Sequence, residues 1–167
     1  MRIIDTRIEN KDSFQVVGLE IDWTPNDANP AENEIAHLWR EFNERKSEIP
    51  NAMPNRTYGL ERFQPNAGPA APLKYLASIE VSNIESEPPK GMIAADVPAS
   101  TYAVVTYQGI IDGIGKAYDH YYRQWEPAMR EYRAAHTFCF EYYDERYKDN
   151  DNDESIIEVW FALTKTS

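Results

Sequence analysis

A glutamate among aromatic residues is the feature of this sequence with the clearest chemical potential. Glu141 lies in Thr137-Phe-Cys-Phe-Glu-Tyr-Tyr143, a composition typical of a β-strand. Side chains alternate across a strand, so Cys139, Glu141 and Tyr143 share one face, and the aromatic residues between them share the other. We expect the wholly aromatic face to pack under helices, which leaves the carboxylate on the face turned away from them.

A carboxylate among aromatic rings suits an organic cation. The negative charge attracts the cation, and ring faces add about 0.5–2 kcal/mol of cation–π stabilisation. Burying a carboxylate is costly unless it is hydrogen-bonded or protonated, so we expect tyrosine hydroxyls beside Glu141. The other candidate ligand-binding residues are Trp160, Tyr143, Glu61, Trp39 and Tyr107. For Glu141, Glu61 and Glu158, the alternative is an exposed strand residue.

Other chemistry has weak support in the sequence. The histidines at 37, 120 and 136 lack zinc-ligand spacing, and nucleotide-binding and serine-hydrolase motifs are absent from the sequence. The single cysteine, Cys139, is best explained as a buried apolar residue. The acidic run Lys148–Glu154 alternates Asp and Asn but lacks the glycine and glutamate of a calcium loop, so we expect a solvated turn. We therefore expect no metal and no cofactor.

Composition narrows the class of protein. The chain has 167 residues, of which 42% are hydrophobic, enough for one domain with a buried core. A net charge of −11 argues against direct nucleic-acid binding, and it either favours cationic ligands or serves solubility. No stretch approaches the roughly 18 apolar residues of a membrane span, and no signal region opens the chain. We therefore expect a cytoplasmic protein.

The elements that must position these residues occur twice in the same order. The strand predictions are 13–22, 57–63, 73–81, 101–107, 137–143 and 155–163, and the amphipathic helix predictions are 31–49 and 110–129. When the segments that begin at Thr57 and Thr137 are aligned, Glu61 and Glu141 fall in register. We predict one domain over residues 1–167, with pseudo-repeats at about 1–83 and 88–167.

This order predicts an α+β fold in which tandem strand–helix–strand–strand repeats form an antiparallel sheet with two helices on one face and a central ligand cleft. In the first repeat, we expect Leu60 to face the core and its neighbours Gly59, Glu61 and Phe63 to face away. In the final strand, the expected core residues are Ile157, Val159, Phe161 and Leu163. Glu158 and Trp160 are expected on the opposite face.

Six short motifs, in this order along the chain, resemble one known family. They are Val16-Val-Gly18, Pro88-Pro-Lys-Gly-Met92, Val97-Pro-Ala99, Tyr102-Ala-Val-Val-Thr-Tyr-Gln-Gly109, Trp125-Glu-Pro127 and Phe140-Glu-Tyr-Tyr-Asp-Glu-Arg-Tyr147. The chain resembles the GyrI-like, or bacterial transcription activator effector-binding, domains over nearly its whole length. Its final strand, Trp160-Phe-Ala-Leu163, departs from the Ile-Pro-Ile type of ending that is common in the family.

The resemblance implies an effector-binding module for aromatic, lipophilic or cationic small molecules, linked to drug sensing or transcription regulation. We expect a stand-alone member, because the chain begins at the effector domain. In drug-sensing members, a glutamate of the Phe-Glu strand supports cation binding within a cage of tyrosines, and this glutamate corresponds to Glu141. Two alternatives remain open. One is a hydrolase of cyclopropane-bearing natural products, with Glu141 as the base. The other is a protein-binding modulator of DNA gyrase, for which the partner would be a protein.

Overall fold

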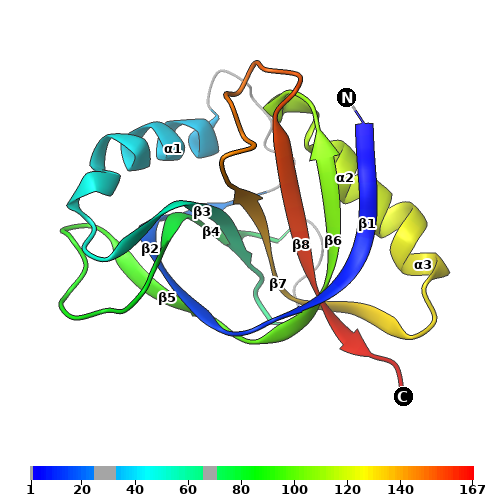
Figure 1. Ribbon diagram of the computed structural model, residues 1–167. Coiled ribbons are helices and arrows are strands. Elements are labelled where there is room, and N and C mark those ends of the chain that lie inside the picture. Colours follow the sequence, from blue (N-terminus) through cyan, green and yellow to red (C-terminus); the bar gives the residue numbers. More distant parts are fainter. Residues whose placement is uncertain (1, 25–32, 66–70) are drawn as a thin grey trace. The chain divides into compact units, whose positions relative to one another are not determined.

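The computed structural model describes residues 2–24, 33–65 and 71–167. By the proximity of Cα atoms, the chain divides into two compact units, residues 13–98 and residues 1–12 with 99–167. Each unit contains four antiparallel strands and a helical segment (Figure 1). The sequence-based prediction of antiparallel strands in a twice-repeated strand–helix–strand–strand order is confirmed.

The unit of residues 13–98 is built on four strands in the order β3-β4-β2-β5. These are β2 (Phe14–Trp23), β3 (Ala52–Arg62), β4 (Leu73–Val81) and β5 (Ile93–Val97). The helix of this unit is α1 (Glu34–Arg45), followed by the short 3-10 helix η2 (Lys46–Glu48). Residues 31 and 32, with which the helix prediction began, lie outside the described residues.

Local sequence explains where α1 begins and which side it buries. The side chain of Asn33 accepts a hydrogen bond from the amide of Ala36 at 3.1 Å, as expected of an N-cap. Leu38 and Phe42 are buried, and Trp39 packs partly against the same core. These residues recur at spacings of three and four, so the buried side of α1 is its apolar side, as expected of an amphipathic helix.

The second unit joins the first strand of the chain to residues 99–167. Its strand order is β1-β6-β8-β7. The strands are β1 (Arg2–Lys11), β6 (Ser100–Gln108), β7 (Tyr132–Tyr143) and β8 (Ile156–Lys165). The predicted helix at 110–129 is confirmed as a helical region, but it consists of four short pieces. These are η3 (Ile111–Gly113), α2 (Gly115–His120), the π-helical η4 (Tyr121–Trp125) and α3 (Glu126–Ala128).

Two strands, β1 and β5, are absent from the sequence-based predictions. β1 pairs antiparallel with β6, about 100 residues further along the chain, and a register shift occurs between Ile3 and Asp5. β5 pairs antiparallel with β2. Both strands are stabilised by partners distant in sequence, which a local pattern does not reveal.

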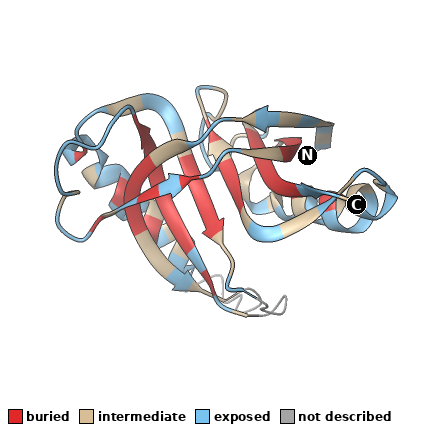
Figure 2. Ribbon diagram, turned by 90° about the horizontal axis from the view of Figure 1, so that it is seen from below, coloured by how far each residue is buried: buried red, intermediate tan, exposed pale blue. Residues whose placement is uncertain are grey.

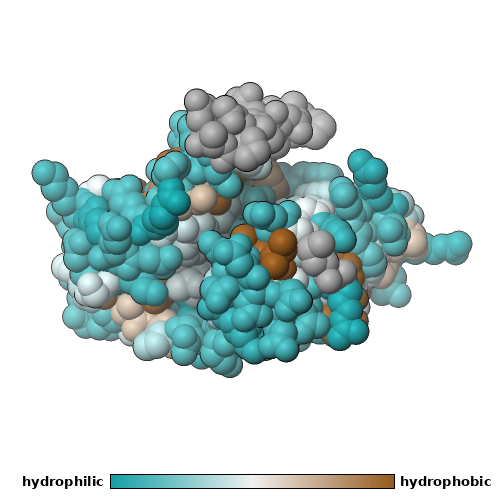
Figure 3. Space-filling view, turned by 90° about the horizontal axis from the view of Figure 1, so that it is seen from above, coloured by the Kyte–Doolittle hydropathy of each residue, from teal (hydrophilic) through white to brown (hydrophobic). Residues whose placement is uncertain are grey.

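Burial is concentrated in the strands of both units. In Figure 2 the buried stretches lie along central strands, whereas the outer sides of the helices are exposed. The face seen in Figure 3 is mainly hydrophilic with small hydrophobic patches, which accords with a net charge of −11. Within the three described ranges, no helix has both the length and the apolar character needed to cross a membrane.

Candidate functional site

The carboxylate of Glu141 is buried and is held by two phenols. Tyr118 on α2 donates a hydrogen bond to Oε2 at 2.7 Å, and Tyr143 on β7 donates to Oε1 at 2.8 Å. Glu141 is only 7% exposed. Tyrosine donors were the expectation from sequence, and the structure confirms them. Because phenols are neutral, they orient the carboxylate and neither of them cancels its charge.

Further aromatic contacts extend from the two tyrosines that hold this carboxylate. The rings of Tyr118 and Tyr122 both meet Phe161 of β8 edge-on, with centroids 5.5 Å apart. The ring of Tyr143 contacts that of Tyr147 edge-on at 5.0 Å. Burial, together with the nearby carboxylates of Asp149, Asp151 and Glu141, raises the pKa of Tyr147 to about 12. The result is a partly exposed group of aromatic rings next to the carboxylate of Glu141.

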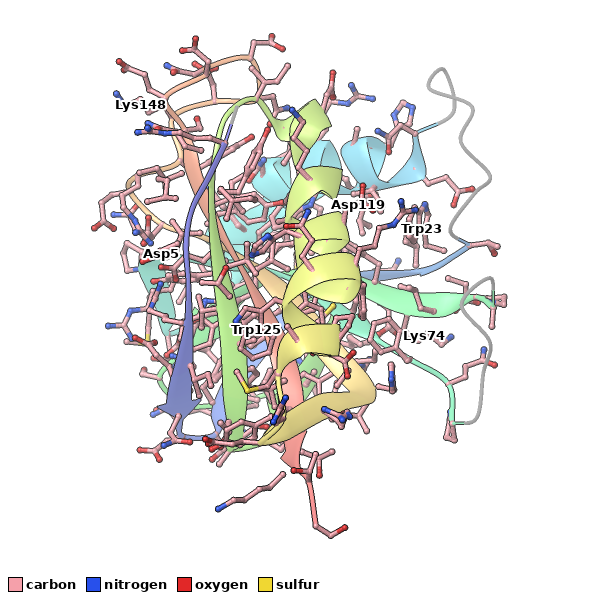
Figure 4. All side chains as sticks on the ribbon, turned by 90° about the vertical axis from the view of Figure 1, so that its right-hand side faces the viewer. Asp5, Trp23, Lys74, Asp119, Trp125 and Lys148 are labelled. Carbon is pink, nitrogen blue, oxygen red and sulfur yellow. The ribbon has the colours of Figure 1, made fainter. Side chains whose placement is uncertain are left out.

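The face of β7 that carries Glu141 is the one covered by the helical segment. Glu141 pairs with Val159 in the β7–β8 ladder, and directly paired residues share a face. Next along that face is Phe161, whose ring stacks on Tyr121 of η4 at 3.8 Å. Figure 4 looks onto this helical segment, with Trp125 labelled, in front of the strands of its unit. The expectation that Glu141 faces away from the helices is therefore wrong.

The opposite face of the same sheet is aromatic as well. Hydrophobicity therefore did not indicate which face of β7 the helical segment covers. Phe140 stacks on Trp160 at 5.5 Å, and Tyr102 contacts both of these rings. Trp160 is buried on this second face, so it does not join Glu141. The sequence correctly placed Glu158 and Trp160 together, on the side of β8 away from Val159 and Phe161.

Glu158 is neutralised by arginines. It accepts from Arg7 at 3.0 Å and from the indole of Trp160 at 3.0 Å, and Arg146 forms an ion pair with it at 3.2 Å. Arg7 and Lys11 also lie over the Trp160 ring, at 6.0 and 5.7 Å from its centroid. This arrangement explains Glu158 as part of a charge-balanced cluster, distinct from the phenol-held Glu141.

The unit of residues 13–98 also has a buried carboxylate on the face of its strands that its helix covers. Glu61 is 8% exposed and pairs directly with Tyr75 in the β3–β4 ladder. Trp39 of α1 donates its indole N–H to the hydroxyl of Tyr75 at 2.9 Å. Because Tyr75 belongs to the core under α1, Glu61 faces the helix too. Phe63 packs partly against the same core, so the expected outward direction of Glu61 and Phe63 is wrong.

The structure thus brings some of the predicted site residues together and separates others. Glu141 and Tyr143 are joined in one unit, and Trp39 and Glu61 both neighbour Tyr75 in the other. Tyr107 lies on the helix-covered face, opposite Ile157, and its hydroxyl donates to the carbonyl of Ile110 at 2.8 Å. That contact indicates a structural role for the phenol.

Tyr118 was missed as a site residue. It lies within the predicted amphipathic helix 110–129, and the available signal was that the apolar side of such a helix has to face the sheet. Glu80 was missed as well. It is buried, and it accepts from Tyr58 at 2.6 Å and from Arg56 at 3.3 Å. Within the described part of the chain, no cluster of three or more His, Cys, Asp or Glu side chains is arranged to hold a metal ion.

Comparisons with known proteins match nearly the whole chain. A family model described as a GyrI-like small molecule binding domain matches residues 4–164. The transcriptional regulator BrlR of Pseudomonas aeruginosa is 31% identical over 166 residues, which are 98% of this chain and 57% of BrlR. The chain therefore spans little more than half the length of this curated relative.

Two solved structures show the same fold at low sequence identity. An integron cassette protein from the mobile metagenome of Vibrio cholerae has a TM-score of 0.72 and 17% identity, covering 97% of each chain. SAV2435 bound to tetraphenylphosphonium has a TM-score of 0.70 and 15% identity, covering 96% of this chain and 94% of SAV2435.

Proposed function

Because this chain belongs to the family of GyrI-like small molecule binding domains, we propose that it binds lipophilic organic cations, with Glu141 as the anionic group of the site. The observation that carries the proposal is the buried carboxylate held by the hydroxyls of Tyr118 and Tyr143. A carboxylate fixed by neutral donors among aromatic rings attracts a delocalised cation more strongly than a solvated carboxylate would, because water screens it less.

Two further observations support a cationic ligand. SAV2435, which has the same fold, was solved with tetraphenylphosphonium, a lipophilic cation. The net charge of −11 also favours the approach of cations from solution. The relationship to BrlR, a transcriptional regulator, supports a regulatory use of binding, in which ligand occupancy at this domain controls transcription.

Titration with tetraphenylphosphonium tests the proposal, with triphenylphosphine oxide as a neutral compound of related shape. We expect the protein to bind the cation more tightly. Glu141→Gln keeps the shape of the side chain and removes the charge, and should weaken cation binding by about 1–3 kcal/mol, roughly tenfold or more. The melting temperature should hold, because an ionised group no longer has to be desolvated.

Glu80→Gln is the matched control. Glu80 is also about 8% exposed and also accepts a hydrogen bond from a tyrosine, but Arg56 pairs with it. Its substitution should leave cation affinity unchanged. Equal affinity for the cation and the neutral compound would contradict the proposal, and so would a folded Glu141→Gln protein that binds as wild type.

A further inference from the structure

The sequence of β1 is self-complementary in charge about its residue Ile8. Reading outward from Ile8, the chain places Arg7 against Glu9 and Asp5 against Lys11, so that each pair joins opposite charges. A strand that pairs antiparallel with a second copy of itself brings these positions opposite one another. The pattern is therefore a sequence suited to pairing with its own copy.

The structure places this strand where such pairing can occur. β1 stands at the end of its sheet order, and within the described ranges its ladder is formed with β6. The segment Asp5–Lys11 is paired without interruption, since the only register shift of β1 lies before Asp5. Ile8 is 40% exposed, so its side chain is accessible to a second copy of the strand. The side chains of Asp5 and Glu9 are 53% and 42% exposed.

The two faces of β1 differ in chemistry. Asp5, Arg7, Glu9 and Lys11 pair with residues on the face that carries Trp160. Thr6, Ile8 and Asn10 share the other face, where the Thr6 hydroxyl lies 2.8 Å from Nε2 of His120. Antiparallel pairing about Ile8 would set four opposite-charge pairs on the first face. On the second face, Ile8 would meet its own copy between two Thr6–Asn10 pairs.

Neighbouring registers are disfavoured. A twofold axis perpendicular to the sheet leaves each face of β1 on the same side in both copies. Residues directly opposite one another therefore belong to the same face, and the axis passes through a residue position, so the registers next to Ile8 are centred on Arg7 and Glu9. A centre at Arg7 sets Arg7 against its own copy and Asp5 against Glu9. A centre at Glu9 sets Glu9 against its own copy and Arg7 against Lys11. Like charges directly opposite one another are destabilising, so the charges on this edge select the centre at Ile8.

We propose that β1 is a homodimer interface, through which two copies of this chain pair antiparallel about Ile8 and extend one sheet into the other. The backbone groups at the outer side of β1 supply the hydrogen bonds, and the charge pattern supplies the register. This interface is independent of Glu141, which lies on β7.

Charge reversal with compensation tests this interface. Asp5→Lys and Lys11→Asp each create two like-charge pairs across the dimer and should raise the dimer dissociation constant by at least about tenfold. The double variant Asp5→Lys with Lys11→Asp restores opposite charges and should dimerise like the wild type. Sedimentation velocity over a concentration series measures each constant, and circular dichroism melts verify that the variants are folded.

Asp119→Lys is the matched control. Asp119 lies on α2 with 70% of its side chain exposed, and its reversal changes net charge as much as Asp5→Lys does (Figure 4). It should leave the dimer intact. Three results would overturn the proposal. These are a monomeric wild type across the series, a double variant that is as monomeric as the single variants, and equal weakening by Asp119→Lys.

Discussion

Two tyrosines on the same helical segment have opposite hydrogen-bonding situations. The hydroxyl of Tyr118 donates to the buried Glu141. The hydroxyl of Tyr121, one turn later, is fully buried and has no hydrogen-bond partner among the described residues. Its ring lies flat against Phe161, and burial raises the pKa of its phenol above the ordinary value. A buried, unpaired hydroxyl costs free energy that a phenylalanine would not.

The substitutions Tyr118→Phe and Tyr121→Phe should therefore have different effects on the free energy of unfolding. Tyr118→Phe removes a donor from a buried carboxylate and should lower the free energy of unfolding by about 1–3 kcal/mol. Tyr121→Phe removes only the unpaired hydroxyl and should leave the free energy of unfolding unchanged or higher. Urea unfolding of both variants measures the difference. A loss of stability in Tyr121→Phe as large as in Tyr118→Phe would show that the Tyr121 hydroxyl has a partner in solution.

At the level of the elements, β2 and β4 can lie at their observed spacing only because residue 18 is a glycine. Gly18 pairs with Ser78 in the β2–β4 ladder, and a Cβ atom at Gly18 would overlap the backbone carbonyl of Ala77. The obstacle is backbone in the middle of a sheet, which cannot move aside as the end of a side chain could. The Val16-Val-Gly18 motif thus has a structural reason for its glycine.

Gly18→Ala should destabilise the fold by about 3 kcal/mol or more, because strands must separate to admit one methyl group. Gly115 provides the comparison. It begins α2, and a Cβ atom there would meet nothing within 4 Å. Gly115→Ala should be neutral or stabilising by up to about 1 kcal/mol, through helix propensity. Thermal melts of the two variants decide this, and similar melting temperatures would contradict the steric explanation.

For the whole molecule, the buried tyrosines predict a loss of stability at alkaline pH. Burial raises the pKa of Tyr102, Tyr107 and Tyr121, and it raises that of Tyr147 to about 12. These folded-state values lie above the ordinary value of about 10, so the fold retains protons that the unfolded chain loses first. The stabilisation is complete below about pH 10 and is lost as the pH rises through about 12.

The contribution of Tyr147 should be about 1–2 kcal/mol, after allowance for its partial exposure. Urea unfolding at about pH 9 and about pH 11 measures the loss, and phenolate absorbance reports ionisation. Tyr147→Phe should reduce the loss. If all 11 tyrosines ionised near pH 10 with no change in unfolding free energy, the explanation would be wrong.

The sequence by itself determined the order of most elements, and it identified Glu141 as a carboxylate held by tyrosine hydroxyls. Apolar residues that alternate with polar ones, or that recur every three to four residues, are local properties of the sequence. Six strands and two helical regions could therefore be predicted near their observed positions. The register between Glu61 and Glu141 also follows from local sequence, and both residues are buried on strands that follow a helix. The family resemblance rested on short motifs and is confirmed over residues 4–164.

Tertiary structure alone decided which side of each strand the helices cover. Alternation divides β7 into two faces, but it identifies the helix-covered face only when one face is clearly more apolar than the other. Here Phe140 and Trp160 fill one face, while Phe161 lies beside Glu141 on the other, so the two faces do not differ clearly in apolar character. β1 was missed for a related reason, because its place in the sheet depends on β6 and not on its own weak pattern. The donation from Tyr118 to Glu141 joins a helix to a strand 23 residues away, and only the packing of one on the other brings the two atoms to 2.7 Å.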